Sequence, residues 1–366
     1  ITPGIYNSWT ECKEQIHEFS GAIYKKFDNM TDAIKFLNIE VNIEVNIEVD
    51  NNKNPTNPFW VAVGQGGNTV AYSINGTQWV GLGTTIFSTQ GTSVYYGNNL
   101  WVAVGSGTNS IAYSSNGTQW TGLGTSLYTS GGSVYYSNGV YLTGGTGTNT
   151  LAYSYNGTSW TGVGVAIFSS TGYGIAFNGT RYVAVGTGTS NAIAYSSNGT
   201  TWTGLGKTLF TTGNSVQYTN SRFLITGDNG SMYSSTDGAT WTSFNVPFGK
   251  GAYDVAYGLD STGAGIWVAV GEGYNSIAYS YDTISWTGLG LTIFTIGKGI
   301  TFNQNRFIAT GLGTTHTVAY SLDGITWNGR GTTFTTSGNN VGSNSLLTVT
   351  SKSYTTSIGY RAGYQN

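Results

Sequence analysis

Seven copies of a short pattern, Ser-x-Asn/Asp-Gly-x-x-Trp, place a hydroxyl two residues before an amide or acid along most of the chain, with Thr in place of Gly in one copy. A serine beside a carboxylate is a pairing that nucleophilic and acid–base catalysis use. Asp237, Asp282 and Asp323 keep the acid, but the other four copies carry asparagine, which does not titrate. The pattern therefore favours a repeated structural device over a repeated active site.

A hairpin turn accounts for the pattern. Asn-Gly between two apolar runs is a strong hairpin signal, because both residues accept positive φ. Ser and Asn or Asp side chains accept local backbone N–H groups, and the following tryptophan is expected to wedge between neighbouring repeats. The residues assigned to this structural motif are Asn75, Trp79, Asn116, Trp120, Asn156, Trp160, Asn198, Trp202, Asp237, Trp241, Asp282, Trp286, Asp323 and Trp327.

Other groupings that support catalysis are sparse. The two histidines, His17 and His316, stand in different segments, so neither a metal cluster nor a nucleophile–base pair is indicated. The run from Gly204 to Thr208 imitates the end of a phosphate loop, but Thr201 stands where the first glycine is required. We expect no catalytic residue, no metal and no cofactor.

Composition excludes several classes of protein. Of 366 residues, 56 are glycine, and aromatic residues reach 14% while charged residues are only 8%, so a packed core is expected rather than disorder. A formal net charge of −2 gives no basis for general nucleic-acid or anionic-membrane binding. No apolar run approaches the roughly 20 residues of a membrane helix, and we expect no membrane insertion. The single cysteine, Cys12, excludes an intramolecular disulfide framework.

The elements that must hold the turns repeat about every 40 residues. The tryptophans of the motif recur at spacings of 41, 40, 42, 39, 45 and 41 residues. In the second repeat the β-like runs are 93–96, 100–105, 110–114 and 118–124, which leaves no room for a helix. Four short strands per repeat, arranged radially, are typical of a β-propeller blade. We predict an all-β fold, a seven-bladed β-propeller of four-stranded blades over residues 59–345.

The first repeat lacks an inner strand of its own. Phe87 precedes Val94 by seven residues, and Phe334 precedes Val341 by the same interval. The segment after the last tryptophan is therefore expected to supply the missing strand and close the ring by strand exchange, which removes an open edge. Residues 346–366 continue in register and leave a partial eighth blade as an alternative. Their ending, SIGYRAGYQN, also resembles one turn of the β-roll in trimeric autotransporter adhesin heads and giant-virus fibre proteins.

Residues 1–37 are predicted to form a small α+β domain that precedes the propeller, because Ser8 and Glu11 form a capping box and apolar residues follow at helical spacing. Residues 38–58 begin with NIEVNIEVNIEVD, whose period of two indicates a strand or a repeat-expanded linker, and continue through a turn-rich hinge. The first 53 residues hold nine of the sixteen acidic residues, so the charge distribution also marks a boundary here.

The pattern GIYNSW-x-x-C, followed by A-x-YKKF and by Ala33 and Phe36-Leu37, resembles the small domain shared by caulimovirus viroplasmin and the N-terminus of eukaryotic ribonuclease H. The resemblance implies binding of an RNA–DNA hybrid, through the residues Trp9, Tyr24, Lys25 and Lys26. The first strand of that family, before the Gly-Ile-Tyr, is missing. The alternative is that the two aromatic side chains are core and the two lysines are solvated.

The turn motif resembles the Asp-box of sialidase-like propellers. That resemblance implies a glycosidase with three arginines on the substrate carboxylate, a Tyr–Glu pair and an aspartate. Of the arginines in the repeats, Arg181, Arg222 and Arg306 occupy a strand-start position where other repeats carry apolar residues. Glu272 is the one glutamate of the repeats, and tyrosine is too common there for its partner to be identified. A sialidase-like glycosidase therefore remains an alternative only.

We expect a non-enzymatic binding or structural propeller. Gly/Thr/Ser/Asn-rich loops at 105–110, 145–150 and 271–276 recur on one rim and offer hydroxyl and amide groups for glycan or protein contacts. The repeat style resembles propeller proteins of giant viruses, which implies a fibre or attachment role at a virion or extracellular surface. The flanking segments are candidates for oligomerisation, and hybrid binding through residues 1–37 is the alternative partner.

Overall fold

The computed structural model describes residues 60–228, 231–303 and 305–343. The chain divides into two units, Ile1–Asn54 and Pro55–Asn366, and the description concerns the second. Our predictions for residues 1–37, 38–58 and 346–366, including those for Trp9, Tyr24, Lys25 and Lys26, concern residues outside this part of the chain.

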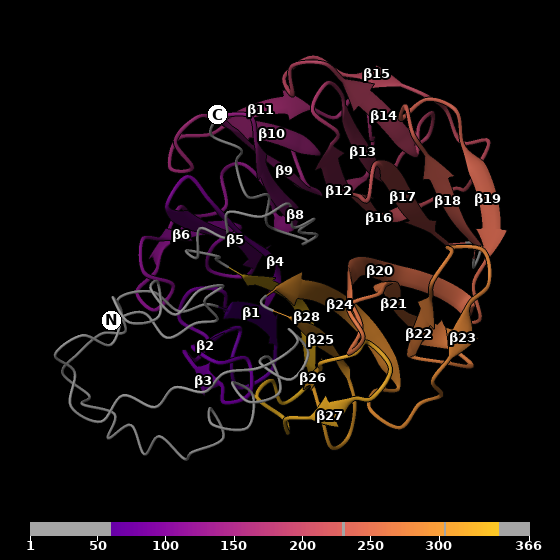
Figure 1. The fold of residues 1–366 in the computed structure, drawn as a ribbon. Helices are drawn as coiled ribbons and strands as arrows, with labels where there is room; N and C mark the ends of the chain where they lie inside the picture. The colour runs from indigo at the N-terminus through magenta and orange to yellow at the C-terminus, as the bar shows by residue number, and fades with distance from the viewer. Residues whose placement is uncertain (1–59, 229–230, 304, 344–366) are drawn as a thin grey trace, which may run out of the picture. The chain divides into compact units, whose positions relative to one another are not determined.

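The described residues form a ring of seven blades around a central axis (Figure 1). Each blade is an antiparallel sheet of four strands, and its shortest strand lies outermost in most blades. Blade 1 consists of β28 (Ser337–Ser343), β1 (Trp60–Gln65), β2 (Val70–Ser73) and β3 (Val80–Gly81). Blade 2 consists of β4 (Gln90–Gly97), β5 (Leu100–Ser106), β6 (Ile111–Ser114) and β7 (Thr121–Gly122). Blade 3 consists of β8 (Ser130–Ser137), β9 (Val140–Thr146), β10 (Leu151–Ser154) and β11 (Thr161–Gly164).

The remaining four blades repeat this order. Blade 4 consists of β12 (Thr171–Phe177), β13 (Tyr182–Thr187), β14 (Ile193–Ser196) and β15 (Thr203–Gly204). Blade 5 consists of β16 (Gly213–Thr219), β17 (Arg222–Gly227), β18 (Ser231–Ser235) and β19 (Thr242–Asn245). Blade 6 consists of β20 (Gly249–Leu259), β21 (Gly265–Gly273), β22 (Ile277–Ser280) and β23 (Thr287–Gly288). Blade 7 consists of β24 (Ile296–Asn303), β25 (Arg306–Leu312), β26 (Val318–Ser321) and β27 (Asn328–Gly329).

The ring closes by strand exchange, as the sequence predicts. β28, from the end of the described chain, pairs with β1 from its beginning, with Val341 opposite Ala62 and Ser343 opposite Trp60. β28 also contacts the inner strands β24 and β4 of the blades on either side. The described ring is therefore complete with seven blades. The residues that we considered for an eighth, 346–366, lie outside the described part.

The core is divided among the seven interfaces between neighbouring blades, each of which holds one apolar cluster. The second strands are buried along nearly their whole length because blades cover both faces. One buried aromatic residue per blade anchors the link from one blade to the next; these residues are Phe87, Tyr128, Phe168, Phe210, Phe248, Phe294 and Phe334. Packing between neighbouring blades thus holds the inner strands in place around the axis.

Candidate functional site

The repeated Ser-x-Asx-Gly-x-x-Trp motif lies at the hairpin between the third and fourth strands of every blade. In blade 2, Ser114 Oγ accepts a hydrogen bond from Gly117 N at 2.8 Å. Asn116 Oδ1 accepts from the N–H groups of Thr118 and Gln119 at 3.0 and 2.9 Å, and Trp120 Nε1 donates to Gly117 O at 3.0 Å. These bonds occupy the serine hydroxyl, the asparagine carbonyl oxygen and the indole N–H within the turn.

The aspartate copies make the same contacts as the asparagine copies. Asp237 Oδ1 accepts from Ala239 N and Thr240 N, both at 2.8 Å. Bonds from the backbone N–H groups of Thr240 and Ala239 hold the pKa of Asp237 well below its usual range, and the N–H groups of Ser285 and Ile284 lower the pKa of Asp282 in the same way. A carboxylate held in this way is a poor proton donor or acceptor near neutral pH.

The tryptophans of the motif are less deeply buried than a full wedge requires. All seven pack against the apolar clusters between blades, but Trp202, with 8% of its surface exposed, is the only buried one. The tryptophans buried almost completely are Trp60, Trp101 and Trp267, which stand on second strands. The motif tryptophans thus cover the blade interfaces from outside, and their indole N–H bonds in six copies of seven complete the turn.

The rim loops also use much of their polar chemistry internally. In blade 2, Asn109 Oδ1 accepts from Gly124 N at 2.8 Å and its Nδ2 donates to Ile86 O at 2.7 Å. In blade 7 His316 stands at the same place, and its Nδ1 accepts from Gly331 N at 3.0 Å. The histidine that sequence analysis examined for catalysis therefore has a structural role in the rim loop, where it accepts a backbone hydrogen bond.

A cavity of about 130 Å³ lies on the axis and is lined by the inner strands of all seven blades. We call it the axial pocket. Each inner strand carries a β-bulge at the same place, where the register to its neighbour shifts by one residue. Bulges re-aim side chains and are enriched beside functional sites. The bulged residues, all of which line the pocket, are Thr92, Gly132, Tyr173, Asn214, Tyr253, Lys298 and Asn339.

The bulge position varies strongly among otherwise similar repeats. Its seven occupants offer a hydroxyl, a bare backbone, two phenols, two amides and an ammonium group. The preceding residue is Gly in six blades and Ala in one, and the residue two places later is always Val or Ile. The residue directly after the bulge also varies, with Ser in three blades, Gly in two, Asp in one and Asn in one, whereas a purely structural position is expected to be uniform. The ring therefore holds a variable set of polar side chains around one pocket, which makes the pocket the candidate site.

Two charged residues line the axial pocket. Asp254 is 1% exposed and accepts bonds from Ile300 N at 2.8 Å and Val255 N at 2.9 Å, but burial raises its pKa well above the usual range. Lys298 Nζ donates to Asn339 Oδ1 at 3.1 Å and to Ser337 Oγ at 3.3 Å, and burial lowers its pKa. The pocket thus contains a desolvated acid and a desolvated amine, each bonded to neutral groups.

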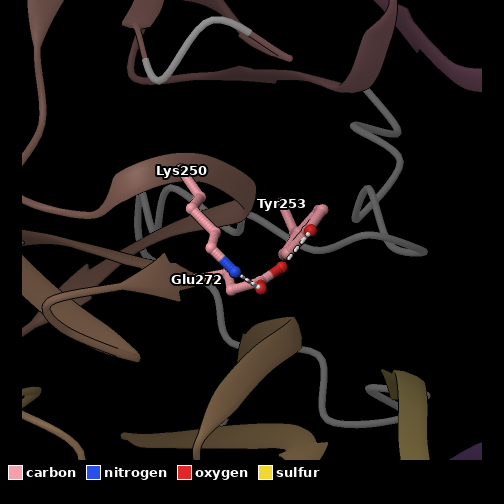
Figure 2. A network of polar contacts seen from close by, with 3 residues as sticks. All are labelled: Lys250, Tyr253 and Glu272. Atoms are coloured by element: carbon pink, nitrogen blue, oxygen red, sulfur yellow. Dashed lines mark hydrogen bonds and ion pairs between the residues drawn. The ribbon is translucent and has the colours of Figure 1, made fainter.

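A second polar group stands on blade 6 beside the pocket (Figure 2). Lys250 and Tyr253 both point to Glu272: Lys250 Nζ lies 2.7 Å from Oε1, and Tyr253 Oη donates to Oε2 at 2.8 Å. Burial, with the bond to Glu272, raises the pKa of Tyr253 to about 12, and the bond from Lys250 lowers that of Glu272. The structure thus identifies the tyrosine partner of Glu272 that sequence analysis left open.

The arginines that would form a carboxylate clamp do not line the axial pocket. Each instead reaches the turn motif of the next blade. Arg181 Nη1 donates to Asp237 O at 3.0 Å and Arg222 Nη1 to Thr283 Oγ1 at 3.3 Å, while Arg306 Nη1 donates to Asn75 O. These arginines link blades on the far end of the strands from the bulges. Within the described residues, no group of three or more His, Cys, Asp or Glu side chains is arranged to hold a metal. The same residues contain no helix that is long and apolar enough to cross a membrane.

Comparison with known proteins separates the two parts of the chain. The ribonuclease H1 N-terminal domain family matches residues 1–37. Ribonuclease H of Saccharomyces cerevisiae is 56% identical over 34 residues, which are 9% of this chain and 10% of the yeast protein. These matches confirm the resemblance predicted for the first 37 residues. The chain spans only about a tenth of the length of that relative.

The propeller is similar to solved structures at low sequence identity. Virginiamycin B lyase from Staphylococcus aureus superposes with a TM-score of 0.55 at 12% identity, over 65% of this chain and 83% of that one. YCF48 from Cyanidioschyzon merolae superposes with a TM-score of 0.50 at 14% identity, over 70% of this chain and 93% of that one. At such identities the likeness shows the fold, an all-β propeller.

Proposed function

We propose that the propeller is a binding module that binds the terminal sugar of a glycan at its axial pocket and does not turn it over. The variation of the bulge residues around one pocket, in repeats that are otherwise nearly alike, is the observation that carries this proposal. A cavity of roughly 150 Å³ holds benzene, and a sugar ring with its hydroxyl groups is larger, so a pocket of about 130 Å³ would take part of the terminal sugar, with the rest of the ligand outside.

The chemistry of the lining favours a ligand rich in hydroxyl groups. Asn214, Gln217 and Asn340 offer amides that both donate and accept, and Tyr173 offers an aromatic face that is 38% exposed. Such groups match the hydroxyl groups of a sugar, which also both donate and accept hydrogen bonds.

Binding without turnover is supported by the state of the acidic residues. Both carboxylate oxygens of Asp254 receive backbone N–H bonds, and Glu272 is held by Lys250 and Tyr253. With its pKa raised to about 12, Tyr253 stays protonated near neutral pH and is a weak nucleophile. Such a module would serve attachment at a virion or extracellular surface, a role that the resemblance of the repeats to giant-virus propellers supports.

The test is a glycan array probed with the full chain and with two variants. Asn214→Gly removes a pocket amide at a position where Gly132 of blade 3 shows that glycine is accepted. Thr108→Gly removes a similar polar side chain from an exposed rim loop. We expect the intact chain and Thr108→Gly to bind the same glycans and Asn214→Gly to lose them. A silent array would argue for a protein contact instead, and hydrolysis of a sialoside reporter would contradict binding without turnover.

We propose as a second function that residues 1–37 bind an RNA–DNA hybrid, supported by the family match to those residues. The double variant Lys25→Met/Lys26→Met should weaken retention of a hybrid in a filter-binding assay and reduce the salt slope by roughly 1 to 2. Lys207→Met, a lysine of blade 4 that donates to Gly188 O, is the matched control. Equal binding by the double variant and the control would contradict the carried-over lysines.

A further inference from the structure

Lys298 brings into the axial pocket a positive charge that has no ion-pair partner among the described residues. It is the bulged residue of β24, and its ammonium group has three N–H donors. Two of these have neutral acceptors, Asn339 Oδ1 at 3.1 Å and Ser337 Oγ at 3.3 Å. Across residues 60–228, 231–303 and 305–343, no carboxylate lies within ion-pair distance of its Nζ. A partly buried charge without an ion-pair partner is unfavourable, so an anionic ligand would be stabilised at this position.

The carboxylates nearest to the pocket are occupied elsewhere. Asp254 lines the pocket, but its two oxygens accept from Val255 N and Ile300 N. Glu272 contacts Lys250 and Tyr253 (Figure 2), and acts on Lys298 only through a longer-range electrostatic attraction. Neither side chain can turn to Lys298 without breaking these bonds. The positive charge in the pocket is therefore available to a ligand.

The remaining lysines and arginines of the propeller are placed differently. Lys250 has 70% of its side chain exposed and is paired with Glu272. Lys207 donates to Gly188 O at 3.0 Å, in the rim of blade 4. Arg181 and Arg306 bond to backbone carbonyl groups of neighbouring turns. Among the described residues that line the pocket, Lys298 is the single cation, which concentrates selectivity for charge at one side chain.

We infer that the axial pocket selects an anionic sugar, with Lys298 as the partner of its negative group. The inference rests on the proposed glycan-binding function and adds the class of sugar. Charge-assisted hydrogen bonds from an amine to a carboxylate or sulfate are roughly twice as strong as neutral ones.

The experiment compares sugars that differ in one group. Calorimetric or NMR titrations with the full chain use the methyl glycosides of glucose, galactose and mannose, each beside its uronic acid and its 6-sulfate. We expect at least one acid to bind about tenfold more tightly than its neutral partner, which corresponds to about 1.4 kcal/mol. The uronic acid and sulfate arms distinguish the two kinds of anion.

Variants assign the effect to Lys298. Lys298→Met should remove the preference for the acid and leave the affinity for the neutral sugar within about twofold, whereas Lys207→Met should change neither. The titration of the unsubstituted chain at rising salt is a second measurement that does not depend on the variant folding: affinity for the acid should fall and affinity for the neutral sugar should not. Equal affinities within every pair would overturn the inference while leaving the proposed function intact. Failure of all sugars to bind, neutral and acidic, would overturn both.

Discussion

At the scale of the residue, the turn motif shows how Asn and Asp can exchange without consequence for the fold. In either case one side-chain oxygen accepts two backbone N–H groups. The glycine of the motif adopts positive φ, for example 75° at Gly117. Blade 6 departs from this rule, because Thr283 takes the same conformation with φ 69°. A β-branched residue in this region is strained.

Replacing Thr283 with Gly should relieve this strain. A non-glycine residue in the left-handed region costs of order 1–3 kcal/mol, but the Thr283 hydroxyl also accepts a bond from Arg222 Nη1. We therefore compare the double variant Arg222→Met/Thr283→Gly with the single variant Arg222→Met, because that bond is absent from both. We expect the double variant to gain about 1 kcal/mol in the free energy of unfolding. Urea denaturation measures it. The reverse change Gly199→Thr should destabilise, and a loss on Thr283→Gly would show that the turn is unstrained.

The aspartate copies of the turn should give the protein an acid-sensitive component of stability. Asp237, Asp282 and Asp323 have lowered pKa values in the fold. A lowered folded pKa stabilises above the unfolded value, near 4, and this stabilisation is lost as pH falls through the folded pKa. The free energy of unfolding should therefore fall less between pH 5 and pH 2 in the triple variant to Asn. Asn116→Asp should increase the fall, and identical pH profiles would contradict the interpretation.

At the scale of the element, most of the blade could be predicted from sequence because the turns and spacings are local signals. Asn-Gly marks the outer hairpin, and the interval from Phe334 to Val341 matches that from Phe87 to Val94, which is enough to predict the closing strand. The bulges could not be predicted in this way, because one inserted residue interrupts the alternation of a strand. The run assigned to 93–96 is in fact β4, Gln90–Gly97, and its bulged residue Thr92 fell outside the run.

Closure by β28 should determine whether the ring is stable. A chain that ends at residue 336 lacks β28 and leaves the backbone of β1 unpaired on one side. An exposed edge promotes pairing between chains. We expect this truncation to lower the unfolding midpoint and to form dimers or aggregates in size-exclusion chromatography. A chain that ends at residue 343 keeps β28 and should match the full chain in its unfolding midpoint. Equal loss in both truncations would show that residues 344–366 contribute to the ring.

At the scale of the whole molecule, the fold and the site depend on different positions of the same strands. Apolar residues such as Val216 hold the blades together, while the bulged residues around the axis differ from blade to blade. Sequence analysis assigned binding to the rim loops, because their polar composition is visible at once. The signal for the axial pocket was also present in the sequence: aligning the repeats on Gly-x-x-Val/Ile exposes two adjacent variable positions, of which the first is the bulged residue. Its meaning required the structure, since only the ring brings seven distant residues together.

Exchanging bulged residues should therefore abolish binding and spare the fold. The double variant Tyr173→Thr/Asn214→Thr places threonine at the bulges of blades 4 and 5. Blade 2 already has threonine at its bulge, Thr92. We expect the free energy of unfolding to change by less than about 1 kcal/mol, with loss of glycan binding on the array. Val94→Thr, two residues from the bulged Thr92, 0% exposed and not part of the pocket lining, should show the opposite pattern: reduced stability by urea denaturation and retained binding. Parallel losses in both variants would mean that site and fold are not separable.

Strand exchange in blade 1 has a consequence for how the propeller can be joined to other segments. Because Trp60 stands opposite Ser343, the chain enters and leaves the ring at neighbouring points of a single blade. The propeller is thus a closed ring whose chain has one break. Hydrogen bonds between β28 and β1, and no covalent link, hold the two sides of this break together. A short connection from Ser343 to Trp60 would close this break, and any outer Asn-Gly turn could then serve as the new beginning and end. The fold of the ring therefore does not dictate where the chain enters and leaves it.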